Sequence, residues 1–142
     1  MESIVPRVDT QNTRSLTNFE VFEFMKARME SKNKVRAQQT LLYTGLKFFQ
    51  EKSPCTTQTP QQIANFLEKI KTCKLKKEEV LALINNCPVT QVELSVLIPD
   101  LDSQFTPAQT DKILALVAEC FPEGVKRSVT INSSGVAEES TD

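Results

Sequence analysis

The chain has 142 residues, of which 17 are basic and 18 acidic, so its formal net charge is −1. This balance argues against a protein whose whole surface grips nucleic acid, because such domains usually have a pI above about 9. The length is that of one domain, and the sequence has no histidine, no tryptophan and only three glycines. Since no NG or DG hairpin signal separates alternating apolar runs, the composition predicts an all-α protein.

The four cysteines, at positions 55, 73, 87 and 120, form no C-x-x-C pair. Zinc sites need closely spaced cysteine or histidine ligands, so we expect no structural metal and no cofactor. Cys73, Cys87 and Cys120 fall at or near apolar helix faces, where a free cysteine behaves as a small hydrophobic residue. Free thiols indicate a reducing compartment. The longest apolar runs are far too short to span a membrane.

The first predicted helix carries an unusually wide apolar surface. Residues 1–14 are polar, and we expect them to be a disordered N-terminus. Thr17 and Glu20 then form a capping box, in which each side chain satisfies the other residue's free backbone amide, and the helix runs to about Ser31. Its apolar residues cover an arc of about 220° at 100° per residue, which indicates either half-exposed phenylalanines or burial on two sides, one of them against a partner chain. They are Phe19, Val21, Phe22, Phe24, Met25 and Met29.

A basic stretch follows the first helix, and Glu30 is its only counter-charge between Lys26 and Arg36. Charge runs between helices are usually solvated. The alternative is a weak contact of Lys32, Lys34 and Arg36 with nucleic-acid phosphates. No aromatic residue lies within the stretch, so no platform for stacking bases is predicted.

Two helices are predicted in the middle of the chain. The first spans about residues 37–50, with Leu42, Leu46 and Phe49 at positions i, i+4 and i+7. The second begins at Thr59-Pro60-Gln61-Gln62, where a cap, a proline at the first helical position and a capping-box glutamine coincide.

A helix over residues 77–86 stops before Cys87-Pro88, because proline removes a hydrogen-bond donor and restricts the residue before it. Lys76 stands at its cap position and cannot accept an amide hydrogen bond, so its first turn is expected to fray or shift by a residue. Thr90 and Glu93 cap the next helix. Its expected buried stripe is Val92, Val96 and Leu97.

The last predicted helix starts at Thr106-Pro107-Ala108-Gln109 and ends near Phe121. Beyond Pro122 the large apolar residues cease, and we expect residues 122–142 to be a disordered acidic tail. A helical domain over residues 15–121 remains. Its expected core includes Leu67, Ile70, Leu81, Ile84, Leu97 and Val117.

No catalytic site is predicted, because general acid–base chemistry most often uses histidine and the chain has none. No serine or cysteine has an identifiable base partner, and no glycine-rich phosphate loop occurs. Asp100 and Asp102 are close in sequence, but a capping or loop role between two helices is the preferred interpretation over metal binding.

Three segments resemble the small stalk subunit of RNA polymerases, a helical family with archaeal and nuclear members. They are LTNFEVFEFM, KLKKEEVLALINNCPVTQVELSVLIPDL and TPAQTDKILALVAECFP, and the resemblance covers about residues 15–121. It implies an HRDC-like helical bundle without catalytic residues, which pairs with a larger OB-fold stalk subunit and with the polymerase core and supports initiation. In this family the N-terminal segment docks on the OB-fold partner. Together with the wide apolar arc, this places the partner surface on Leu16, Phe19, Val21, Phe22 and Met25.

Within the family, LTNFEVFEF and YTGLKFFQEKSPCTTQTPQQI are most similar to the RNA polymerase III branch. The segments NNCP and LIPDL are closer to the RNA polymerase II branch. The resemblance therefore implies a nuclear subunit of RNA polymerase III. The alternatives are the RNA polymerase II or archaeal-type paralogue, or a free helical adaptor in receptor signalling or RNA binding.

Overall fold

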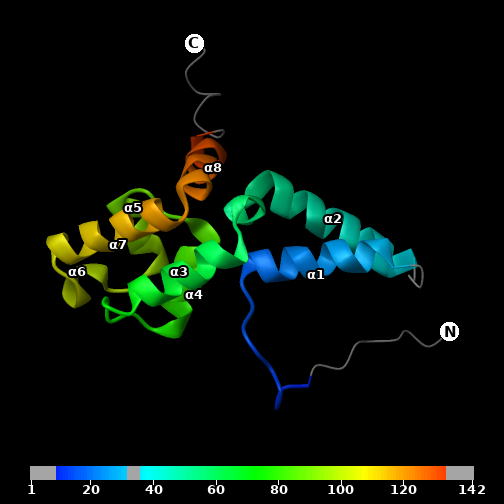
Figure 1. The fold of residues 1–142 in the computed structure, drawn as a ribbon, viewed down its shortest axis with the longest axis horizontal. Helices are drawn as coiled ribbons and strands as arrows, with labels where there is room; N and C mark the ends of the chain where they lie inside the picture. Colours follow the sequence, from blue (N-terminus) through cyan, green and yellow to red (C-terminus); the bar gives the residue numbers. More distant parts are fainter. Residues whose placement is uncertain (1–8, 32–35, 134–142) are drawn as a thin grey trace, which may run out of the picture.

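The computed structural model describes residues 9–31 and 36–133, and within these ranges the regular structure is entirely helical. The prediction of an all-α fold is confirmed. The elements are α1 (Asn18–Glu30), α2 (Arg36–Lys52), the 3₁₀ helix η1 (Pro54–Thr57), α3 (Pro60–Ile70), α4 (Lys77–Asn86), α5 (Gln91–Leu97), α6 (Leu101–Gln104), α7 (Pro107–Cys120) and α8 (Pro122–Ser133). In Figure 1, α3 to α7 form a helical body, and α1 and α2 project from it side by side.

The helix starts predicted from the sequence are confirmed by their hydrogen bonds. In each of four capping boxes, the threonine hydroxyl accepts the amide three residues on, and the side chain there accepts the threonine amide. The pairs are Thr17 with Glu20, Thr59 with Gln62, Thr90 with Glu93 and Thr106 with Gln109. Helix α4 lacks such a bond at Lys76 but still begins at Lys77, and Glu78 and Glu79 in its first turn favour the helix dipole.

The core of the body lies between α3, α4, α5 and α7. Phe66 of α3 packs against Phe121 at the end of α7, with ring centroids 5.2 Å apart. Leu83, Leu94 and Ile113 reach the same core from α4, α5 and α7, and all three are fully buried. Each of these helices therefore contributes one apolar face to a single core.

The predicted core is correct in part. Ile70, Ile84 and Val117 are buried as expected, whereas Leu81 and Leu97 are half-buried. The prediction that Leu67 is buried is wrong, because its side chain is 42% exposed. It follows Phe66 directly, and the 100° step between neighbours on a helix turns its side chain away from the core that Phe66 enters.

The stripe predicted for α5 is also wrong. Val92 and Val96 are 75% and 79% exposed, while Leu94 and Ile98 are fully buried. Both pairs are apolar with a spacing of four residues, so periodicity over a helix of two turns does not distinguish them. Contacts from α7 decide which pair faces inward.

Helix α8 corrects the expectation that residues 122–142 form a disordered tail. It spans Pro122–Ser133 and packs on η1 and α7. Apart from Val125, which packs on the core of the body, its contacts use small and polar residues, which a search for large apolar side chains overlooks. A Cβ at Gly124 would lie 2.9 Å from the Cys87 sulfur, and the buried Ser128 hydroxyl donates to the Asn86 carbonyl at 3.1 Å. Residues 134–142 and 1–8 lie outside the described residues.

Helices α1 and α2 form an antiparallel hairpin with its own apolar seam. Phe22 is buried and meets Phe49 edge-on, with centroids 6.1 Å apart. Leu42 is buried beside them, and the absence of a side chain at Gly45 leaves room for the Met25 methyl group. The seam buries one face of each helix, and large apolar side chains on the flanks of the hairpin remain exposed.

The hairpin joins the body at the end of α4. The Asn18 amide donates to the Asn85 side-chain oxygen at 2.8 Å, which satisfies a free amide of the first turn of α1. On the other side, a single extended residue, Ser53, links α2 to η1, and its hydroxyl accepts the Cys55 amide at 3.2 Å.

We predict that Leu83→Ala lowers the free energy of unfolding by about 2–5 kcal/mol, because it leaves a cavity in the core. Leu67→Ala is the matched control. The same atoms are removed from a side chain that is 42% exposed, and the loss should be below about 1 kcal/mol. Urea unfolding followed by circular dichroism measures both values. Equal losses would contradict this assignment of the core.

Candidate functional site: the flanks of the α1–α2 hairpin

Exposed large apolar side chains gather on the hairpin. Phe24 of α1 is 67% exposed, and Leu41, Tyr43 and Phe48 of α2 are 69%, 61% and 55% exposed. Leu16, just before α1, is 39% exposed. Isolated exposed apolar residues are ordinary, but several on one small unit indicate an interaction surface.

The helical spacing sorts these residues into faces. On α1, Val21, Phe24, Met25 and Arg28 are at i, i+3, i+4 and i+7, so they share one side. On α2, Leu41 and Phe48 are two turns apart and lie on one flank of the residues that face α1. Tyr43 and Lys47 lie on the opposite flank of α2.

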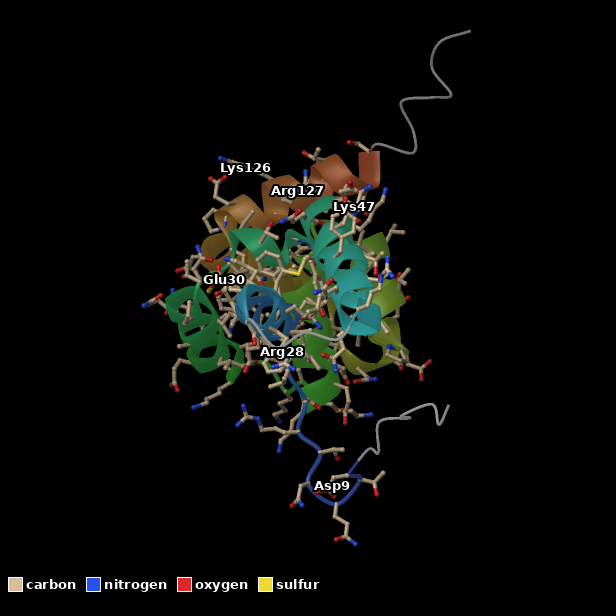
Figure 2. The ribbon with its side chains drawn as sticks, turned by 90° about the vertical axis from the view of Figure 1, so that its right-hand side faces the viewer. Asp9, Arg28, Glu30, Lys47, Lys126 and Arg127 are labelled. Carbon is tan, nitrogen blue, oxygen red and sulfur yellow. The ribbon has the colours of Figure 1, made fainter. Side chains whose placement is uncertain are left out.

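Figure 2 shows how the flanks of the two helices combine. The view runs along the hairpin, with Arg28 below α1 and Lys47 above α2. The side of α1 that carries Arg28 and the side of α2 away from Lys47 therefore lie on the same flank of the hairpin. We call this flank the docking flank. It consists of Val21, Phe24, Leu41 and Phe48, and Met25 lies between it and the seam.

The predicted partner residues differ in how far their side chains are exposed. Leu16 is exposed, and Phe19, Val21 and Met25 are half-buried. Phe22 is 6% exposed and packs against Phe49, so little of its side chain is accessible on the surface of this chain. The wide arc on α1 does face two ways, but its inner side meets α2.

Sequence reasoning overlooked Leu41 and Phe48 as surface residues. The sequence does contain a pattern that could have revealed them. Leu41 and Phe48 are seven residues apart, and each is one residue before a member of the inward-facing pair Leu42 and Phe49, so they lie on a different side of α2. A second apolar pair out of phase with the buried one is the same pattern that drew attention to α1.

The predicted phosphate contacts are not brought together by the described residues. Lys32 and Lys34 lie outside them, and Arg36 is exposed at the first position of α2. A second basic group surrounds the turn between α3 and α4, where Lys74 and Lys112 line a cavity of about 380 Å³.

Within residues 9–31 and 36–133, no three histidine, cysteine or carboxylate residues are close enough together to hold a metal ion. Asp100 has a left-handed backbone (φ 55°) before α6, and its carbonyl accepts the Ser103 and Gln104 amides at 3.1 Å. Over the same part of the chain, no helix is long and apolar enough to cross a bilayer.

The four cysteines are free thiols in this structure, and Cys55, Cys87 and Cys120 are buried. Burial raises the pKa of Cys87 to about 12, although the Gln58 amide donates to its sulfur and opposes the shift. Burial likewise raises the pKa of Cys55, against a hydrogen-bond contribution from Ser53. Since the thiolate is the nucleophile, both side chains are held in their unreactive form.

The sequence model of one family, described as RNA polymerase Rpb4, matches residues 15–121. The match spans well over half of the chain. This protein belongs to the RNA polymerase Rpb4 family. Members are non-catalytic stalk subunits that associate with the polymerase core and with an Rpb7-type stalk partner. The matched residues contain the whole hairpin and end one residue before α8.

We predict that at pH 8 a thiol reagent modifies the half-buried Cys73 in the folded protein and spares Cys55 and Cys87, whose pKa values burial raises. Quenched labelling followed by peptide mass measurement gives the rate at each site. In denaturant all should react alike, and Cys73→Ser should remove the fast reaction. Rapid modification of Cys87 in the folded state would contradict the closed packing of α8 on this thiol.

The pKa of Cys87 also predicts how stability depends on pH. Its folded pKa is about 12, above the ordinary value of 9.0, so the unfolded chain loses this proton first. The contribution to stability is therefore fully present below about pH 9 and is lost as pH rises toward 12. Cys87→Ala should flatten this alkaline decline in urea-unfolding measurements.

Proposed function

We propose that this protein is the small stalk subunit of nuclear RNA polymerase III and that it supports transcription initiation by holding a larger OB-fold subunit. Membership of the Rpb4 family supports the stalk role. The segments LTNFEVFEF and YTGLKFFQEKSPCTTQTPQQI, which resemble the RNA polymerase III branch, support the choice of polymerase. The proposed mode of action rests on the exposed apolar side chains of the docking flank.

The docking flank suits a protein partner because it presents three large exposed apolar side chains on two packed helices. Phe24, Leu41 and Phe48 supply aromatic and aliphatic anchors, which commonly carry most of the binding energy of an interface. Arg28 lies at its edge and adds a positively charged rim. The Phe22–Phe49 contact beneath the flank keeps both helices in register, so little order has to be gained on binding.

The RNA polymerase II paralogue is the second candidate, because NNCP and LIPDL resemble that branch. Both segments lie inside the body. Asn85 and Cys87 form the end of α4, and Ile98 is fully buried. Residues with internal packing roles report less on the choice of polymerase than residues on the docking flank, so we prefer RNA polymerase III.

The two candidates are separated by purifying the tagged native protein and identifying its partners by mass. The proposal requires subunits specific to RNA polymerase III together with one OB-fold subunit. Recovery of RNA polymerase II subunits would favour the paralogue. A monomer with salt-dependent affinity for RNA would favour a free helical adaptor.

We predict that Phe24→Asp combined with Leu41→Asp abolishes pairing with the OB-fold subunit. Each change places a charge in the apolar patch, and loss of such an anchor costs roughly 2–4 kcal/mol of binding free energy. Co-expression and pull-down, followed by calorimetry on the purified chains, measure the loss.

Tyr43→Asp is the matched control, since Tyr43 is 61% exposed on the opposite flank of the same helix. It should leave binding unchanged, and all variants should retain the circular dichroism of the wild type. Pairing at wild-type affinity by the double variant would place the interface elsewhere. Loss of pairing in Tyr43→Asp alone would assign it to the other flank.

A further inference from the structure

Helix α8 touches both parts of the molecule, although the family match ends one residue before it. Two adjacent side chains make the connection. The Arg127 guanidinium donates to the Gln50 carbonyl at 2.6 Å and to the Glu51 carbonyl at 3.4 Å, and the Ser128 hydroxyl donates to the Asn86 carbonyl at 3.1 Å.

These acceptors lie at two helix ends. Gln50 and Glu51 belong to the last turn of α2, and Asn86 is the last residue of α4. The last four carbonyls of a helix have no partner within it, and they carry the negative end of the helix dipole. A cation from α8 is therefore well matched to the end of α2.

The rest of α8 is anchored firmly on the body. Ser128 is 4% exposed, and Gly124 lies against the Cys87 sulfur. Near the other end, the Asn132 amide donates to Glu93 of α5 at 2.8 Å. Burial disfavours the charged form of Glu93, but the Val89 and Thr90 amides and Asn132 outweigh this and lower its pKa, so Glu93 stays an ionised acceptor.

A restraint at the end of α2 affects the orientation of the whole hairpin relative to the body. Ser53 alone separates α2 from η1, so a small rotation there would swing the whole hairpin against the body. The Asn18–Asn85 bond restrains α1 at the same base. Arg127 restrains α2 from the other side, and Figure 2 shows it at the top of the molecule with Lys47, away from Arg28 and the docking flank.

We propose that Arg127 is a positioning residue, which sets the angle between the α1–α2 hairpin and the helical body and thereby orients the docking flank. α8 lies outside the residues that match the family model. Its contact with α2 is distant from the docking flank, so the docking flank stays accessible to a partner. The consequence of Arg127 for partner affinity rests on the proposed function, whereas its consequence for the hairpin angle does not.

Residual dipolar couplings of the full ¹⁵N-labelled chain test the angle directly. In the wild type, the couplings of α1–α2 and of α3–α7 should fit a single alignment tensor. In Arg127→Ala they should require two tensors, because the hairpin then samples several orientations. Lys126→Ala is the matched control: its ammonium pairs with Glu123 inside α8, and it should behave as the wild type. A single unchanged tensor for Arg127→Ala, or the same change in Lys126→Ala, would overturn the proposal.

Calorimetry with the purified OB-fold subunit tests the functional consequence. If the competent orientation falls to about one tenth of the population in Arg127→Ala, the apparent Kd rises about tenfold. Two tensors with an unchanged Kd would overturn the link to docking. If the wild type itself does not bind the OB-fold subunit, the proposed function fails, while the result on the hairpin angle stands by itself.

Discussion

The arrangement of this protein depends on the C-terminus of α4. Pro88 forbids another helical turn, and Cys87 adopts a left-handed backbone with φ 45°. Two backbone carbonyls and one side-chain oxygen in the last turn of α4 accept hydrogen bonds from three separate segments. Gln58 donates to the Ile84 carbonyl at 2.6 Å, Ser128 donates to the Asn86 carbonyl, and the Asn85 side chain accepts the amide that starts α1. One helix end thereby joins η1, α8 and the hairpin.

The body and the hairpin are each stabilised by an apolar cluster of their own. The body buries its apolar faces in a core closed by Phe66 and Phe121, and the hairpin is stabilised separately by the Phe22–Phe49 contact. The exposed apolar side chains on the flanks of the hairpin belong to neither of these two clusters.

The starts of four of the helices were within reach of the sequence. Capping boxes at Thr17, Thr59, Thr90 and Thr106 act within four residues, so local hydrogen bonding alone determines them. The two-sided apolar character of α1 was also visible from its period. For the candidate site, the period did not separate Phe22, which meets α2, from the exposed Phe24, because a helical wheel does not say which side of the arc will meet another helix.

By itself, the sequence determined an all-α chain of the Rpb4 family with an N-terminal helix too apolar for one core. Only the tertiary structure decided which of two equivalent apolar pairs on α5 is buried, and that Leu41 and Phe48 complete a flank with Phe24. It alone revealed α8, which is held on the fold by Gly124, Val125, Arg127, Ser128 and Asn132. Local rules read propensity and period, whereas these outcomes depend on contacts between residues far apart in the chain, and small or polar side chains give no periodic signal of such contacts.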